Sequence, residues 1–320
     1  MSIVIPGGIT PPMTIARRVL FQWAALFGCW LIVSPAEAQT VEVAATTAFT
    51  EGPTADREGN VYFSEIVSQR ILKLGPTGVL ATYREHSNNA NGLVIDPEGR
   101  LIACEGATFT RNGVTTKGIP RVTRTDLRTG SMEVLAESYE GMPFKGPNDV
   151  TFDGKGRIYF TDLPASAVYR IDGPGKIVKL LGAPDVERPN GIQVSPDDTV
   201  LYVADSAPVG QGVRLLRAYD LRTDGSIANK RVLYDFGMVR GIDGMSVDVQ
   251  GNLYGAAGQL RDGQLGIHVI SPQGKLLKVI PIPEEPITND TFGGPDMKTL
   301  YVTAGKSLYK VRTEIAGLPR

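Results

Sequence analysis

The chain has 320 residues, of which 42% are hydrophobic, and its 33 basic residues nearly balance 34 acidic ones to give a formal net charge of -1. This balance leaves no basic field for a nucleic-acid backbone, so the sequence argues against a nucleic-acid partner. The 37 glycines and 22 prolines indicate many short strands joined by turns. No stretch beyond residue 40 keeps the apolar spacing of a long helix.

The first 38 residues differ from the rest of the chain. An arginine pair at residues 17–18 precedes an apolar run over residues 19–33, and a small-residue pattern ends at Ala38. This order is typical of a secretory signal peptide cleaved after Ala38, and the run is short for a membrane anchor. We therefore expect residues 1–38 to be removed, leaving one domain over residues 39–320. We expect that domain to be periplasmic or secreted, without stable membrane insertion.

Two cysteines occur in the whole sequence, Cys29 and Cys104. Because Cys29 falls in the expected signal peptide, Cys104 would be the single thiol of the mature domain, and no intramolecular disulfide could form. Cys104 lies in the apolar run LIACE, which favours a small buried side chain over a nucleophile.

From residue 51 onward the sequence repeats one pattern six times. Each repeat opens with a residue that carries a side-chain oxygen. It continues as an apolar strand, a turn of Asp, Pro and Gly, and a second β-rich strand. Repeats of roughly 40–50 residues with four strands are typical of a β-propeller. We therefore predict an all-β, six-bladed propeller with four-stranded blades around a central channel. The six leading residues are Glu51, Asn91, Asn148, Asn190, Asp243 and Asn289.

Segments outside the repeats have predicted places in this ring. The apolar, β-branched segment Val41–Phe49 precedes the first repeat, and we expect it to add a strand to the last blade and close the ring. Longer spacings in two repeats predict extra loops around residues 108–120 and 207–212, which would overhang one face.

The six leading residues predict a cation site. Innermost strands line the channel of a propeller, so equivalent residues at their starts converge at one mouth. Carboxylate and amide oxygens suit a hard cation, Ca²⁺ before Mg²⁺. Only two histidines exist, which argues against a zinc site built from imidazoles. We expect Glu51, Asn190 and Asp243 to be ligands, with Asn148 as a further ligand or substrate contact.

A purely structural interpretation of these residues competes with the cation site. Asn-Gly and Asp-Gly pairs are frequent hairpin turns that bind nothing. Here the pair opens a strand instead of joining two strands, and the polar residue recurs at six aligned places. This recurrence favours ligands, most strongly for Glu51, Asn190 and Asp243. We expect Asn91 and Asn289 to contact substrate.

At these motifs the chain resembles the SMP-30/gluconolactonase family of six-bladed propellers. The resemblance runs from about residue 51 to residue 311, and the motifs together and in this order are specific. It implies a divalent cation in the channel, usually Ca²⁺, and hydrolysis of sugar lactones or related esters. By position the resemblance assigns that cation to Glu51, Asn190 and Asp243, with Asn148 as a further contact. The motifs are EGP from Glu51, PND from Pro147, PNG from Pro189, DGM from Asp243 and FGG from Phe292.

The chain departs from the family at one place. Members that act on sugar lactones often carry Arg shortly before the Asn of the second motif, whereas Gly146 and Pro147 stand here. Lys145 is nearby, but an ammonium does not reproduce the fork of a guanidinium. The departure leaves the particular sugar open.

A mechanism follows from the predicted site. A channel Ca²⁺ would polarise a lactone carbonyl, and Asp243 would take a proton from the attacking water, with Glu51 mainly a ligand. We expect His86 and Glu105, which lie near blade mouths, to contact substrate. Mg²⁺, Mn²⁺ and Zn²⁺ remain alternative cations, and the oligomeric state stays open.

Two other functions remain compatible with the sequence. One is a hydrolase of the same fold that acts on phosphotriesters or aryl esters, and the other is a binding propeller without chemistry. The two acidic leading residues, Glu51 and Asp243, argue against a pure scaffold, which has no need to bury carboxylates near an axis. No Gly-x-Ser-x-Gly motif is present, which argues against a serine hydrolase.

Overall fold

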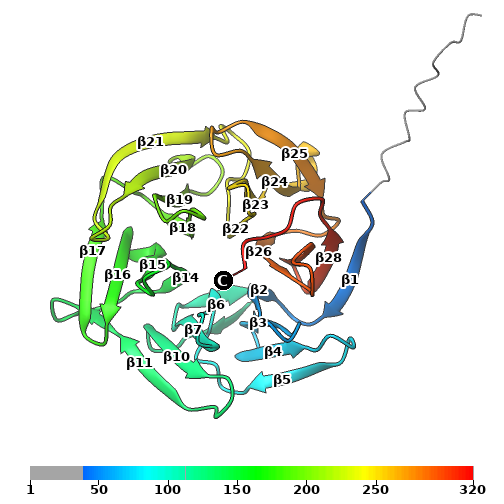
Figure 1. The fold of residues 1–320 in the computed structure, drawn as a ribbon, viewed down its shortest axis with the longest axis horizontal. Helices are drawn as coiled ribbons and strands as arrows, with labels where there is room; N and C mark the ends of the chain where they lie inside the picture. The colour runs from blue at the N-terminus through cyan, green and yellow to red at the C-terminus, as the bar shows by residue number, and fades with distance from the viewer. Residues whose placement is uncertain (1–38, 112, 320) are drawn as a thin grey trace, which may run out of the picture. The chain divides into compact units, whose positions relative to one another are not determined.

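The computed structural model describes residues 39–319 except residue 112. Six antiparallel sheets of four strands each surround a central axis (Figure 1). The prediction of a six-bladed propeller with four-stranded blades is therefore confirmed. Within the described residues the helices are two single 3₁₀ turns, Leu163–Ala165 and Leu260–Asp262. None of the helices in that part of the chain has the length and hydrophobicity to cross a membrane.

The blades follow one another along the chain, each starting at the axis and ending at the rim (Figure 1). Blade 1 holds β2 (Thr50–Ala55), β3 (Val61–Glu65), β4 (Arg70–Leu74) and β5 (Leu80–Arg84). Blade 2 holds β6 (Leu93–Ile95), β7 (Arg100–Glu105), β10 (Arg121–Asp126) and β11 (Met132–Ala136). Blade 3 holds β14 (Pro147–Phe152), β15 (Ile158–Asp162), β16 (Ala167–Gly173) and β17 (Lys176–Leu181).

Blades 4 to 6 complete the ring, and two short hairpins lie outside the blades. Blade 4 holds β18 (Pro189–Val194), β19 (Val200–Ser206), β20 (Arg214–Leu221) and β21 (Ile227–Asp235). Blade 5 holds β22 (Met245–Val247), β23 (Leu253–Ala257), β24 (Gly266–Ile270) and β25 (Leu276–Pro281). Blade 6 holds β26 (Ile287–Gly293), β27 (Thr299–Ala304), β28 (Ser307–Arg312) and β1 (Val41–Thr46). The hairpins are β8 (Phe109–Arg111) with β9 (Val114–Thr116), and β12 (Ser138–Tyr139) with β13 (Met142–Pro143).

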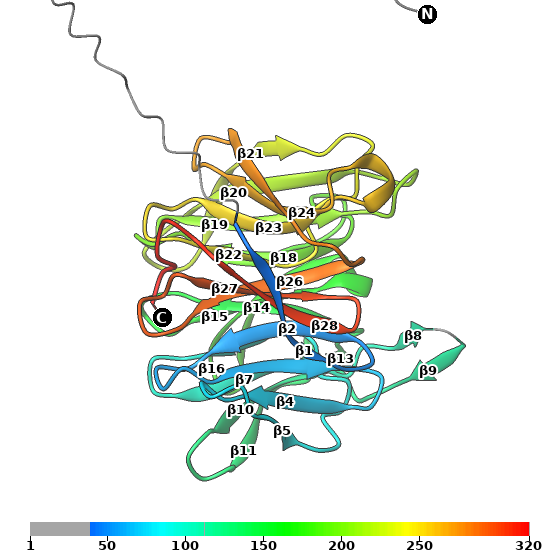
Figure 2. The same ribbon diagram turned by 90° about the vertical axis from the view of Figure 1, so that its right-hand side faces the viewer.

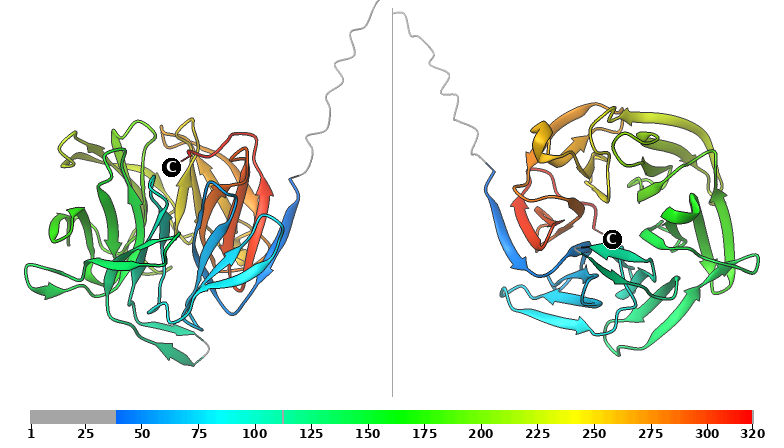
Figure 3. Two further views of the ribbon diagram at one scale, coloured as in Figure 1. Left: turned by 60° about the horizontal axis from the view of Figure 1, so that its bottom comes forward. Right: turned by 180° about the vertical axis from the view of Figure 1, so that it is seen from behind.

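The ring is closed by the N-terminal strand. β1 pairs antiparallel with β28, from Val41 opposite Val311 to Thr46 opposite Ser307. Figure 3 shows this strand along the outside of the last blade. The pairing covers the edge that β28 would otherwise expose, which confirms the predicted closure.

Apolar side chains fill the space between neighbouring blades. Cys104 belongs to the cluster between blades 2 and 3, where it is fully buried with Phe144 and Phe160. Burial raises the pKa of its thiol well above the usual range. Cys104 is therefore a small core residue, as the sequence indicated.

Four blades share one hydrogen-bonded turn between their first two strands. One oxygen of an Asp carboxylate accepts the backbone N–H groups two and four residues later, which folds the turn back on its own side chain. The other oxygen accepts a side chain four residues on. In blade 4 the hydroxyl of Ser195 replaces the carboxylate. The four carboxylates are Asp56, Asp96, Asp153 and Asp248.

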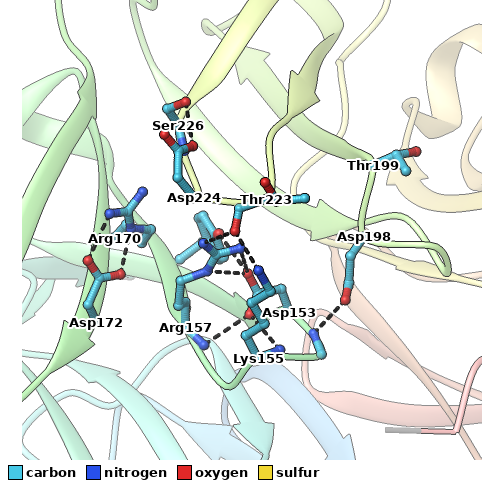
Figure 4. A network of polar contacts seen from close by, with 12 residues as sticks. Asp153, Lys155, Arg157, Arg170, Asp172, Asp198, Thr199, Thr223, Asp224 and Ser226 are labelled. Carbon is cyan, nitrogen blue, oxygen red and sulfur yellow. Dashed lines mark hydrogen bonds and ion pairs between the residues drawn. The ribbon is translucent and has the colours of Figure 1, made fainter.

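The turn of blade 3 also ties two blades together (Figure 4). Arg157 Nε donates to Asp153 at 2.6 Å, and its Nη1 donates to the carbonyl of Thr223 at 3.1 Å. Lys155 Nζ reaches the same carbonyl at 2.6 Å, and Gly154 N donates to Asp198 at 2.8 Å. Both Thr223 and Asp198 lie in turns of blade 4, so this turn links blade 3 to blade 4.

The predicted loop at residues 108–120 is the β8–β9 hairpin, which projects from one face of the ring (Figure 2). Phe109 stacks on Phe49 with ring centroids 4.9 Å apart, and the Arg111 guanidinium lies 4.2 Å from the Phe49 centroid. The hairpin is therefore attached to the chain two residues before Glu51.

Candidate cation and active site

The six leading residues gather at one mouth of the channel. Each one either lies within the first half of an innermost strand or immediately precedes that strand. Neighbouring openings are joined by backbone hydrogen bonds: Gly92 N to Asn148 O at 2.8 Å, and Gly191 N to Asp243 O at 2.6 Å. Topology thus brings together residues that are far apart in the sequence.

The glycine after a leading residue permits this close approach. A Cβ at Gly92 would lie 2.5 Å from Asn148 O, and one at Gly191 would lie 2.6 Å from Asp243 O. A Cβ at Gly244 would meet the Asn289 side chain at 1.9 Å. The Asn-Gly and Asp-Gly pairs are therefore not hairpin turns here, because their glycines let adjacent inner strands touch.

Three carboxylates share the interior of this mouth. Burial raises the pKa of Glu51 well above its usual range, and the negative charges of Asp243 and Asp149 raise it further. Burial also raises the pKa of Asp149, to about 8, with a second contribution from Asp243. A hydrogen bond from Asn289 opposes that shift. The site therefore concentrates negative charge that its own cations do not neutralise.

Asp243 is held through both of its oxygens. Asn190 Nδ2 donates to Oδ1 at 2.6 Å. Arg240 Nη2 forms an ion pair with Oδ2, while Arg240 Nη1 donates to the Ile287 carbonyl at 2.7 Å. These contacts fix the orientation of the Asp243 carboxylate.

Two amide oxygens at the same mouth have no hydrogen-bond partner. Both Asn190 Oδ1 and Asn91 Oδ1 are buried, in residues only 6% and 8% exposed. Buried polar atoms are normally satisfied, so such orphan oxygens point to a missing ligand. Together with the carboxylates of Glu51 and Asp243, they provide the oxygen donors that a hard cation prefers.

A cation at this mouth needs the asparagine oxygens as well as the carboxylates. In the described part of the chain, no group of three or more His, Cys, Asp or Glu side chains is placed to hold a metal ion. A cation at this mouth therefore has to combine carboxylates with asparagine oxygens. The residues present fit a Ca²⁺-like ion on this basis.

Asn148 and Asn289, which were also predicted for this site, differ in how their side chains are engaged. Asn148 is half-buried, and its backbone carbonyl accepts the hydrogen bond from Gly92. Asn289 is buried, and its side chain is engaged: Nδ2 donates to Asp149 Oδ1 at 2.8 Å, and Oδ1 accepts from Asp290 N at 2.8 Å. In this structure Asn289 positions Asp149 and offers no free oxygen to a substrate.

The remaining two predicted residues are His86 and Glu105. His86 is exposed and has a left-handed backbone conformation with φ 52°. Glu105 is fully buried, and its oxygens accept from Asn88 at 3.1 Å, Arg121 at 2.9 Å and Thr123 at 2.7 Å. Arg84 forms a further ion pair with it. Because these donors surround it, Glu105 fastens the β7 end to neighbouring segments.

Sequence reasoning missed Asp149 and Arg240. Asp149 follows Asn148 directly, so in a regular strand its side chain would point to the opposite face. The β14–β15 register shifts between Pro147 and Val150, and such a bulge redirects side chains. The repeated Asn-Asp pairs at 148–149 and 289–290 were the available signal. For Arg240, only its position three residues before Asp243 was visible.

The fold and this mouth together define a six-bladed propeller with an acidic, oxygen-lined channel. Residues 49–306 match the SMP-30/Gluconolactonase/LRE-like region, and the chain belongs to that family. Gluconolactonase from Zymomonas mobilis is 27% identical over 312 residues, covering 86% of this chain and 81% of that relative. Regucalcin from Xenopus laevis is 26% identical, covering 82% of this chain and 85% of its own.

Solved structures place the same architecture in several proteins. A gluconolactonase from Xanthomonas campestris has a TM-score of 0.73 at 24% identity, covering 86% of this chain and 89% of its own. The calcium-binding protein regucalcin from Agrobacterium tumefaciens has a TM-score of 0.68 at 21% identity, with coverages of 87% and 93%. A streptogramin B lyase also matches, with a TM-score of 0.58 at 15% identity and coverages of 87% and 99%. These likenesses concern the fold, which does not by itself choose the reaction.

Proposed function

We propose that the protein is a lactonase that hydrolyses sugar lactones or related small esters with the help of a divalent cation, Ca²⁺ first. One observation carries the proposal: the orphan Oδ1 of Asn190 lies on the same side chain that binds Asp243, beside a buried and charge-crowded Glu51. The relatives named gluconolactonase, and the lactonase of Staphylococcus aureus at 26% identity, support the same reaction class.

Glu51, Asn190 and Asp243 would hold the cation, with Asn91 and Asn148 at the edge of the same mouth. When bound, the cation polarises the substrate carbonyl and offsets the negative charge that develops on its oxygen. The pKa of Glu51 is raised first by burial and then by the negative charges of Asp243 and Asp149, and the positive charge of the cation would oppose both effects.

Asp243 is the proposed general base for the attacking water. Asn190 and Arg240 hold its carboxylate in one orientation, so a water on its open side would be deprotonated at a fixed position. A lactone is an activated ester, for which a weak but well-placed base is sufficient.

The proposed substrate is small and enters from the mouth next to the β8–β9 hairpin. Gly146 and Pro147 stand where sugar-lactone hydrolases of the family often carry Arg, so this chain would recognise its sugar through other groups. We also propose that the protein is exported, on the signal-like sequence of residues 1–38, which lies outside the described residues.

Hydrolysis of glucono-δ-lactone tests the proposal, with a phosphotriester and an aryl ester assayed in parallel. We expect chelation to abolish lactone hydrolysis, and Ca²⁺, compared with Mg²⁺, Mn²⁺ and Zn²⁺, to restore it best. Asp243→Asn should lower kcat by roughly 10²- to 10⁴-fold, the usual contribution of general base catalysis. Asp220→Asn is the matched control, because Asp220 lies on β20, is partly exposed and pairs with Arg231 of β21, and neither strand is an innermost one. Lactone hydrolysis that survived both chelation and Asp243→Asn would refute this mechanism.

A further inference from the structure

The channel has a second chamber, which begins beside the leading residues and extends toward the other end of the channel. A cavity of about 350 Å³ is lined by residues of all six innermost strands; Asp149 and Asn289 border it on the side of the leading residues, whereas Glu51, Asn190 and Asp243 do not line it. Strand residues of its wall include Thr54, Ile95, Thr151, Gln193, Val247 and Thr291.

The C-terminal segment covers this end. Leu318 N donates to Val247 O at 3.0 Å, and Gly317 N donates to Met297 O at 2.8 Å. Leu318 and Pro319 form part of the cavity wall, and Figure 1 shows the chain end close to the axis. The cavity is therefore a chamber between the inner strands and the C-terminal segment.

Asp290 is an incompletely satisfied carboxylate in the wall of this chamber. The residue is 3% exposed, and Ser246 Oγ donates to its Oδ1. Its Oδ2 is buried and has no hydrogen-bond partner. Asp149, which is 6% exposed, lines the same chamber, and its Oδ1 accepts from Asn289.

No counter-charge meets these two carboxylates within the described chain. The ion pairs of that part of the molecule include neither Asp149 nor Asp290. The other charged residues of the wall are Asp56, whose oxygens are bonded within its own turn, and the exposed Arg57. Two buried negative charges without compensation are strongly unfavourable, so they must share protons or a bound cation.

We propose that this chamber is a second cation site, in which Asp290 Oδ2 is the principal ligand of a divalent cation of the Ca²⁺ type. The Asp149 carboxylate and the Ser246 hydroxyl lie on the same wall and contribute oxygens of the class that Ca²⁺ prefers. The chamber has room for the waters that complete the coordination of such an ion. The inference does not depend on the proposed lactonase reaction, because its principal ligand, Asp290, is not among the residues proposed to hold the catalytic cation. Asp149 borders both places, since it lines the chamber and its charge acts on Glu51.

Counting bound ions tests this site without measuring activity. The full chain is stripped with a chelator and then titrated calorimetrically with Ca²⁺ up to about 1 mM, the range of weak extracellular sites. The number of ions that remain after gel filtration in Ca²⁺ is measured by elemental analysis. We expect two ions per chain in the wild type, one in Asp290→Asn, one in Asp243→Asn, none in the double variant, and two in the control Asp220→Asn.

The outcomes separate this proposal from the lactonase proposal. The wild type could bind a single ion that is lost in Asp290→Asn and retained in Asp243→Asn. This result would support the site at Asp290, here called the distal site, and refute the site at Glu51, Asn190 and Asp243. An unchanged count and affinity in Asp290→Asn would overturn the distal site, leaving protons to neutralise the chamber. If Asp290→Asn does not fold, Ser246→Ala decides: loss of this oxygen should weaken the second binding event roughly tenfold, and no change would overturn the proposal.

Discussion

The turn carboxylates and the channel carboxylates belong to the same repeats but differ in how their oxygens are used. At the turns, Asp56, Asp96, Asp153 and Asp248 accept hydrogen bonds on both oxygens from groups within five residues. In the channel, one oxygen of Asp290 has no hydrogen-bond partner, and burial together with neighbouring negative charge raises the pKa values of Glu51 and Asp149.

Within each repeated unit, the turn carboxylates therefore serve folding and the channel carboxylates serve ligand binding. A carboxylate that is saturated by its own turn stabilises the chain and has no capacity left for a ligand. A carboxylate that remains unsatisfied or charge-crowded after folding costs stability, and a ligand can recover that free energy. The turn carboxylates Asp96, Asp153 and Asp248 are as buried as the channel carboxylates, so burial alone does not distinguish the two kinds.

The largest expected effect is on the channel side. Glu51→Gln removes one anionic oxygen ligand and should weaken Ca²⁺ binding at the leading-residue mouth by at least about 100-fold. Calorimetry with Ca²⁺ measures the loss, and Glu133→Gln, a change at an exposed acid on β11, is the control. If Glu51→Gln bound Ca²⁺ as tightly as the wild type, Glu51 would belong with the structural carboxylates.

The turn side should respond in stability and not in binding. Asp153→Ala removes the acceptor for two backbone N–H groups, Arg157 and the Tyr159 hydroxyl. We expect the free energy of unfolding in urea to fall by about 2–4 kcal/mol, since four donors, among them the buried Tyr159 hydroxyl, lose their acceptor. Ca²⁺ stoichiometry should stay unchanged in the folded protein, and Asp153→Asn, which keeps one acceptor oxygen, should cost less. A loss of Ca²⁺ sites in Asp153→Ala would remove the distinction between the two sets.

The pH dependence of the cation-free protein gives a third comparison. The pKa of Asp149 is about 8 in the folded state, against 3.8 for an ordinary Asp. Between these values the folded protein holds a proton that the unfolded chain has released, so stability falls as the pH rises. Asp149→Asn should flatten this slope by up to about 1.4 kcal/mol per pH unit, measured by urea unfolding from pH 5 to 8 in chelator. An unaltered slope would show that Asp149 is ionised in the cation-free fold.

The smallest expected effect concerns Arg240. Its guanidinium pairs with Asp243 and so competes with a cation for the same carboxylate. Arg240→Gln should strengthen Ca²⁺ binding by roughly 3- to 10-fold, because a nearby positive charge is removed. Arg231→Gln, at the exposed pair with Asp220, should leave the affinity unchanged. Weaker binding in Arg240→Gln would mean that Arg240 mainly positions Asp243.

Much of the architecture could be predicted from the sequence because it is repeated. Six aligned openings, the Asp-x-x-Gly turns and the β-rich second strands each reflect local rules of turn and strand formation. The N-terminal strand of the last blade followed from the need to cover an edge. Glu51, Asn190 and Asp243 were visible as candidates because equivalent strand starts converge in any ring.

The rest depended on details that local patterns do not carry. Asn289 resembles Asn190 in the sequence, yet its side chain is used by Asp149 and Asp290. Glu105 ends a strand near the mouth, but surrounding donors engage it. Whether a side-chain oxygen remains without a hydrogen-bond partner depends on neighbouring residues from several blades. The sequence of a single repeat does not contain those neighbours.

By itself the sequence determined the ring, its six blades, its closure and the mouth at which the leading residues meet, because each follows from short-range periodicity and chain order. Only the tertiary structure decided that the glycines serve strand contact, that Arg240 holds Asp243, and that Asp149 and Asp290 face a second chamber. The physical reason is that hydrogen-bond saturation and charge crowding are properties of the assembled channel. They arise where six strands from distant parts of the chain come within a few atoms of one another.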